Sequence, residues 1–80
     1  MKKQVSIKLL RKLYRADNKY WRTGDTDALY KRMDLAKAID SKFWGDIVSI
    51  AHIVTQKHLS VDTFAKCLGL LGYEIAEVDE

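Results

Sequence analysis

Apolar residues recur every three or four positions through most of this chain, which is the period of an amphipathic helix. The clearest case covers residues 5–22, where the apolar side chains fall in one broad sector of the helical wheel. That sector holds Leu9, Leu10, Leu13, Ala16, Tyr20 and Trp21. The same spacing predicts three further helices at about residues 26–39, 42–55 and 61–71.

Residues suited to helix ends separate these predicted helices. After the break at residues 22–25, either Asp25 or Thr26 is placed to cap the second helix. Asp40-Ser41 signals the start of the third helix, and Ser60 the start of the fourth. Gly72 suits the left-handed position that ends a helix.

The third helix has the richest apolar stripe, so we expect it to be central. The stripe consists of Phe43, Ile47, Ile50, Ala51 and Val54. In the second helix the positions expected to face inward are Leu29, Met33, Leu35, Ala36 and Ile39. Residues 73–78 alternate weakly, which leaves open a short strand that pairs across a dimer or an acidic end without regular structure. We therefore predict an all-α, single helical domain over residues 1–80, made of four helices with a possible short C-terminal strand.

Composition supports this fold class. The chain has 80 residues, 48% of them hydrophobic and 31% charged, which is the range of one small globular domain. It contains no proline, the residue that most often breaks helices. Its one cysteine, Cys67, forbids an internal disulfide and suits a reducing compartment. Without a secretory signal or a long apolar stretch, the protein is expected in the cytoplasm.

Charge is distributed unevenly along the chain. Residues 1–22 carry eight basic side chains and one acidic residue, Asp17, whereas residues 59–80 carry one basic residue and five acidic ones. Within the first helix the basic residues form a sector opposite the apolar one: Lys8, Arg11, Lys12, Arg15, Lys19 and Arg22. A merely solvated face would mix both signs at i,i+4 spacing, because like charges at that spacing repel. This single-sign sector is therefore a candidate surface for binding nucleic acid or an acidic partner.

Catalytic and metal-binding patterns are missing. His52 and His58 are six residues apart, and no further His or Cys completes a zinc set. Cys67 falls among apolar positions of the fourth helix, which indicates a buried and inert thiol. No pair of acidic residues suggests acid–base chemistry. We expect a protein that is not an enzyme and that has no cofactor, metal or small-molecule substrate.

Two segments resemble Xre-type (Cro/repressor-like) helix-turn-helix proteins, among them antitoxins. Residues 59–75, from Leu59-Ser60 to the Leu71-Gly72 turn, resemble the last helix of that family, and residues 34–39 resemble its first motif helix. The resemblance implies that the third helix occupies the recognition position and faces the major groove of DNA. The groove-facing residues that it implies are Ser49, His52, Gln56, Lys57 and His58.

Three functions are compatible with the sequence. The first is a small DNA-binding regulator, of antitoxin or phage-repressor type, whose basic first helix contacts phosphates. Reading palindromic DNA would require a homodimer. The second is a phage inhibitor or adaptor that binds an acidic protein surface in host nucleic-acid or defence machinery, such as CRISPR complexes. The absence of arginine from the third helix favours this second hypothesis. The third, a membrane-surface module, is disfavoured because the apolar side of the first helix is needed for the core.

Overall fold

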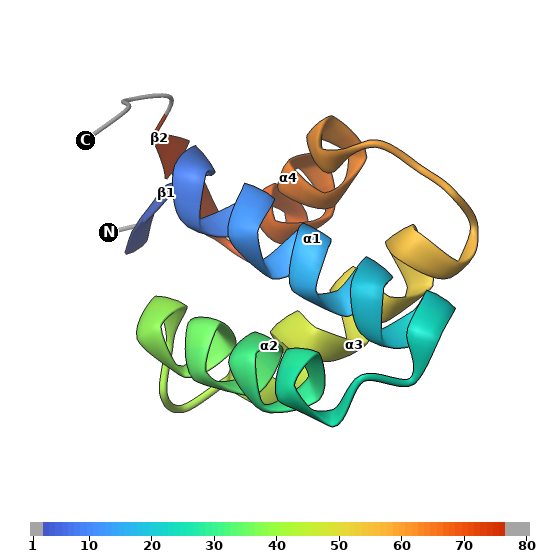
Figure 1. The fold of residues 1–80 in the computed structure, drawn as a ribbon. Coiled ribbons are helices and arrows are strands. Elements are labelled where there is room, and N and C mark those ends of the chain that lie inside the picture. Colours follow the sequence, from blue (N-terminus) through green and yellow to red (C-terminus); the bar gives the residue numbers. More distant parts are fainter. Residues whose placement is uncertain (1–2, 77–80) are drawn as a thin grey trace.

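Four helices and a two-stranded sheet make up the structure, a computed structural model that describes residues 3–76 (Figure 1). In chain order the elements are β1 (Lys3–Ser6), α1 (Ile7–Thr23), α2 (Thr26–Ile39), α3 (Trp44–Gln56), α4 (Val61–Leu70) and β2 (Tyr73–Ala76). In Figure 1, α1 crosses the front of the molecule between α2 and α4, and α3 lies behind it. The predicted fold class, four helices with a short C-terminal strand, is confirmed.

The helix ends follow from the capping residues. Ser6 begins α1, where its hydroxyl accepts a hydrogen bond from the Lys8 amide, and Gly24 ends it with a φ of 70°. Asp25, rather than Thr26, caps α2 and accepts from the Asp27 amide at 2.9 Å. Ser60 caps α4 as predicted, by accepting from the Thr63 amide.

The start of α3 differs from the prediction. The Asp40 carboxylate accepts from the Lys42 amide at 3.0 Å and so caps a turn over residues 41–43, not the helix itself. The helix then begins at Trp44, with no side-chain cap on the preceding Phe43. Phe43, which we expected in the apolar stripe, is 46% exposed because it belongs to this turn.

The sheet corrects the predicted start of the first helix. Residues 5 and 6 belong to β1 and not to that helix, because Ser6 caps α1 and Val5 pairs with Ile75 of β2. β1 pairs in parallel with β2 of the same chain, from Lys3 opposite Tyr73 to Ser6 opposite Ala76. The predicted C-terminal strand thus has a partner within its own chain, while pairing across a dimer stays a prediction. Residues 77 and 78 of the predicted strand lie outside the described residues.

Large side chains of α1, α3 and α4 form most of the core, to which α2 adds two alanines and Ile39. The largest fully buried apolar side chains are Leu10, Leu13, Ile47, Val54, Phe64 and Leu68. Ala28, Ala36 and Ile39 are the buried residues of α2. Leu29, Met33 and Leu35 are only partly buried, and of these three Leu35 packs against the core. The alanines let α2 approach α1 closely, and this contact defines the groove described below.

Candidate nucleic-acid interface

On the outer side of α1, every charged side chain is basic. All six members of the basic sector are exposed, and we call them the basic face: Lys8, Arg11, Lys12, Arg15, Lys19 and Arg22. From Lys8 to Arg22 the face extends about 21 Å at 1.5 Å per residue. The sequence thus located the exposed cations of α1 correctly, since helical periodicity puts them opposite the apolar residues that the core buries.

Packing on the opposite side of α1 aims the basic face outward. Leu10, Leu13 and Asp17 are buried on that side, and Asp17 contacts α3 through Thr55. Arg15 lies two residues before Asp17, so the two side chains point about 160° apart around the helix axis. The basic face therefore points away from α3 and into solvent.

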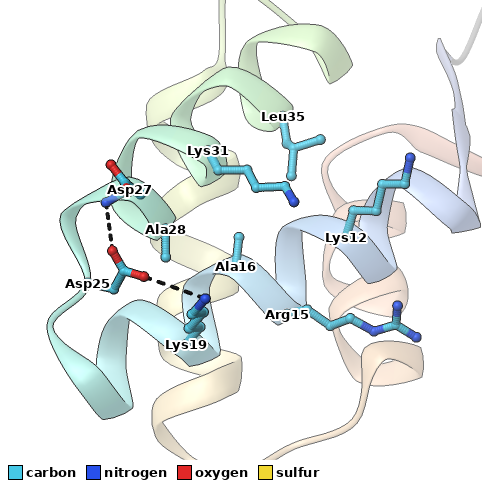
Figure 2. A pocket seen from close by; sticks show the side chains of 9 residues that line it. All are labelled: Lys12, Arg15, Ala16, Lys19, Asp25, Asp27, Ala28, Lys31 and Leu35. Carbon is cyan, nitrogen blue, oxygen red and sulfur yellow. Dashed lines mark hydrogen bonds and ion pairs between the residues drawn. The ribbon is translucent and has the colours of Figure 1, made fainter.

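A groove with a volume of about 500 Å³ runs between α1 and α2, beside the basic face (Figure 2). Its lining consists of Lys12, Arg15, Ala16, Lys19, Asp25, Asp27, Ala28, Lys31 and Leu35. Ala16 and Ala28 are buried and keep the two helices close together. The Nζ atom of Lys19 lies 3.5 Å from Asp25, so one of the basic side chains in the groove is paired with an acid.

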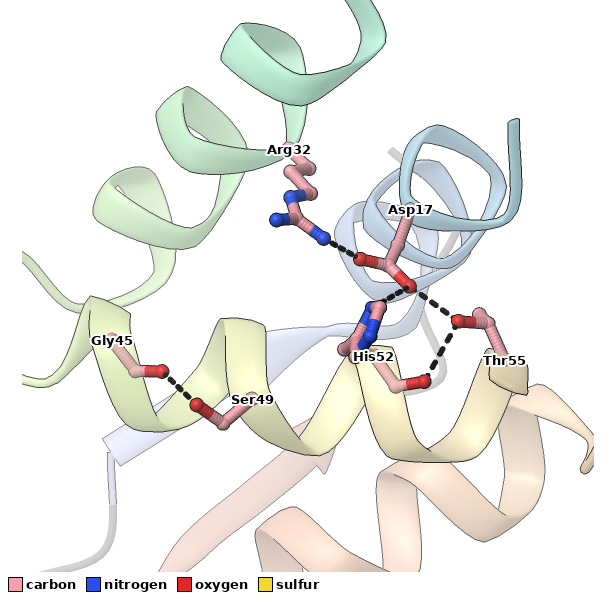
Figure 3. A network of polar contacts seen from close by, with 6 residues as sticks. All are labelled: Asp17, Arg32, Gly45, Ser49, His52 and Thr55. Atoms are coloured by element: carbon pink, nitrogen blue, oxygen red, sulfur yellow. Dashed lines mark hydrogen bonds and ion pairs between the residues drawn. The ribbon is translucent and has the colours of Figure 1, made fainter. Parts of the chain in front are cut away.

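Beneath α1, a buried polar cluster ties three helices together (Figure 3). Asp17 is fully buried, and its carboxylate accepts hydrogen bonds from Arg32 Nη1 of α2 and from the Thr55 hydroxyl of α3. His52 of α3 places Nδ1 3.7 Å from the same carboxylate. The Arg32 guanidinium also lies over the Tyr20 ring, 4.7 Å from its centroid. A buried carboxylate needs such partners, because desolvating an unpaired charge is costly.

Sequence reasoning missed this cluster, although a signal was present. Asp17 is the only acid among residues 1–22, and it lies four residues after Leu13, on the apolar side of the helix. An acid at that position requires a buried cation or donor. Its partners, Arg32 and Thr55, come from other helices, so the sequence offered no way to identify them.

Of the five residues implied to face a DNA groove, four are exposed and His52 is partly buried. Ser49 and Gln56 are exposed on α3, and the Ser49 hydroxyl donates back to the Gly45 carbonyl oxygen. His52 instead packs against α1, where its ring meets Trp21 edge to face with 4.6 Å between centroids. Lys57 and His58 are exposed in the turn after α3, and His58 has a φ of 56°.

The polar side of α3 and the basic face of α1 lie on different sides of the molecule. The side of α3 that carries Thr55 contacts α1, and Ser49 lies about 120° away from Thr55 around the helix axis. Because the basic face points away from α3, a straight duplex lying along α1 would have α1 between itself and α3. One duplex therefore does not reach both surfaces.

A second hollow, of about 340 Å³, lies near the sheet. Acidic residues outnumber basic ones in its lining, whereas basic residues predominate in the groove. Lys3, Asp40, Phe43, Asp46, Leu71, Gly72 and Tyr73 line it. The Tyr73 hydroxyl donates to Asp40 at 3.1 Å. The hydrogen bond from the Lys42 amide lowers the pKa of the Asp40 carboxyl, and Tyr73 and Lys3 lower it further. Burial raises the pKa of Tyr73, and its bond to Asp40 adds to that effect.

Within residues 3–76, no three His, Cys, Asp or Glu side chains are placed to hold a metal ion. Cys67 is partly buried on α4. None of the described helices has the length and apolar character needed to cross a membrane.

No protein-family model, curated protein or solved structure matches this chain. The resemblance of residues 34–39 and 59–75 to Xre-type proteins therefore stays a prediction.

Proposed function

We propose that this protein is a small, non-enzymatic DNA-binding regulator that holds duplex DNA through the phosphates. The observation that carries the proposal is the basic face, where six exposed cations follow one side of a 17-residue helix. Like charges stacked at i,i+3 and i,i+4 destabilise an isolated helix by a few tenths of a kcal/mol per pair. A polyanion that neutralises them removes this repulsion and releases counterions, which favours binding.

Phosphate contacts, rather than base contacts, account for the affinity in this proposal. Residues 44–56 contain no lysine or arginine, and the first turn of α3 exposes the carboxylate of Asp46. An acid at that point would repel phosphates as the helix entered a groove. We therefore assign DNA contact to α1 and not to the helix that the Xre resemblance puts in the recognition position.

The test is duplex binding measured by fluorescence anisotropy at salt concentrations from about 50 to 200 mM. The variant replaces Arg11, Lys12 and Arg15 together with glutamine, which removes three positive charges. The matched control neutralises three exposed lysines outside α1 and outside the groove, Lys37, Lys42 and Lys66. We expect the α1 variant to lower both the affinity and the slope of log K against log salt, by about 0.9 for each lost phosphate contact. The control should change both quantities much less.

Two outcomes would overturn the proposal. Absence of duplex binding at the lowest salt would do so, as would equal effects of the variant and the control. A basic face that does not bind DNA would support the second candidate function, an inhibitor or adaptor that docks on an acidic protein surface. The observation that favours this candidate is the lack of basic residues on α3.

A further inference from the structure

The groove between α1 and α2 receives cations from both helices. Lys12 and Arg15 line it from α1, and Lys31 lines it from α2 (Figure 2). In Figure 2 the Lys31 side chain extends from α2 towards α1. Lys31 lies outside the basic face, so periodicity along α1 does not reveal it. The fold thus adds a cation from a second helix to one edge of the basic face.

These three cations lack acidic partners within the part of the chain that the structure describes. Lys12, Arg15 and Lys31 form no ion pair among residues 3–76. The two acids of the groove are Asp25 and Asp27, at the start of α2. Asp25 is engaged as the cap of α2 and by Lys19, 3.5 Å away. The end with Lys12 and Lys31 therefore attracts anions, and the end with Asp27 repels them.

The groove also has an apolar floor. Ala16 and Ala28 are buried where the helices touch, and the partly buried Leu35 forms part of the wall at the Lys31 end. A phosphodiester strand combines both requirements, because its charged oxygens suit the cations and its sugars tolerate apolar contact. The cations also continue along α1 beyond the groove, with at least one at almost every turn. A row of this kind fits a ligand whose negative charges repeat evenly.

We infer that this groove seats one phosphodiester strand of the bound nucleic acid, with Lys31 as a phosphate-contacting residue and Asp27 marking the end that the strand avoids. The inference rests on the proposed function for the identity of the ligand. It adds Lys31 of α2 as a contact, gives the strand a path along the α1–α2 groove, and predicts which end of the groove the strand avoids.

The test compares Lys31→Gln with Lys66→Gln in the same anisotropy titration. Both lysines are exposed and both substitutions remove one positive charge, but Lys66 is on α4 and outside the groove. We expect Lys31→Gln to weaken duplex binding by about three- to ten-fold and to reduce the salt slope by about 1. Lys66→Gln should leave the slope unchanged. Thermal unfolding of both variants checks that the fold is intact.

A third variant changes affinity in the opposite direction. Asp27→Asn removes the repelling carboxylate and leaves the Asp25 cap and its bond to the residue 27 amide in place. We expect it to bind the duplex more tightly than the wild type, with an unchanged or steeper salt slope. Amide chemical-shift changes on DNA addition should be largest around Ala16, Ala28 and Leu35, where the groove is lined.

The outcomes separate this inference from the proposed function. If the wild type binds DNA and the α1 triple variant does not, but Lys31→Gln equals Lys66→Gln, the groove assignment is wrong and the function stands. If the wild type does not bind the duplex at all, both fail. Binding of a polyglutamate peptide that depends on Lys31, without duplex binding, would assign the groove to an acidic protein instead.

Discussion

The buried Asp17 side chain ties α1 to two neighbouring helices. Its carboxylate is fully buried and joins Arg32 and Thr55, so it connects α1 to both α2 and α3. This connection fixes how α1 is rotated, and therefore which of its sides faces solvent. The basic face depends on this buried acid as well as on the apolar residues around it.

Replacing Asp17 by alanine should destabilise the protein strongly. It leaves the Arg32 guanidinium, whose side chain is 13% exposed, without its carboxylate partner. Breaking a buried ion pair in this way costs about 3–5 kcal/mol. The measurement is urea unfolding at neutral pH. Lys19→Gln, which breaks the exposed pair with Asp25, should cost less than about 1 kcal/mol.

If Asp17→Ala fails to fold, Thr55→Val provides a milder version of the same test. It removes one hydroxyl donor to Asp17 and nearly preserves side-chain volume, so we expect a loss of about 1–2 kcal/mol. Unchanged stability of the valine variant would contradict a structural role for the cluster.

Near the sheet, the pKa shifts of Asp40 and Tyr73 predict a loss of stability at opposite ends of the pH range. The native pKa of Asp40 is lowered from 3.8, so its ionised form stabilises the fold above that pH, and the stabilisation is lost as the pH falls. The native pKa of Tyr73 is raised from 10.0, so its contribution is present below that pH and is lost as the pH rises. Asp40→Asn should therefore flatten the acid side of the stability profile, and Tyr73→Phe the alkaline side. Thermal unfolding across pH checks this, and a Tyr73→Phe variant with an unchanged alkaline side would contradict it.

At the scale of elements, two exposed glycines have opposite roles. Gly24 ends α1 with a φ of 70°, which other residues adopt at a cost, whereas Gly45 lies within α3. A Cβ atom added at either position meets nothing within 4 Å. The effect of substitution is therefore set by backbone conformation and not by packing.

Alanine at these two positions should change stability in opposite directions. Gly24→Ala is expected to destabilise by about 1–2 kcal/mol, because the left-handed conformation strains a side chain. Gly45→Ala should stabilise by up to about 1 kcal/mol, because alanine has the higher helix propensity. Both are measured by urea unfolding, and effects of the same sign would contradict the assigned helix ends.

At the scale of the whole molecule, the basic face lies on one side only. The basic face points away from α3, so the exposed Ser49 and Gln56 of α3 do not meet a duplex that lies along α1. A double Ser49→Ala, Gln56→Ala variant should therefore keep the duplex affinity and salt slope of the wild type. Anisotropy titration checks this. A clear loss of affinity would place DNA on α3, as the Xre resemblance implies.

Much of this arrangement could be predicted from the sequence. Helical periodicity places the exposed cations of α1, and local capping chemistry places Ser60 and the positive φ at Gly72. Both depend on residues a few positions apart in the chain. The error at the start of α3 was also local, because Asp40 can cap either a turn or a helix and both patterns look alike.

Tertiary structure alone decided the features that join distant residues. β1 and β2 pair although about seventy positions separate them, the partners of Asp17 come from two other helices, and Lys31 reaches the groove from α2. The sequence by itself determined four amphipathic helices and the single-sign charge of the first one. It did so because a helix repeats every 3.6 residues and sorts its own side chains. Which helices meet, and in which rotation, depends on packing between them, and that packing shaped the groove and turned the basic face outward.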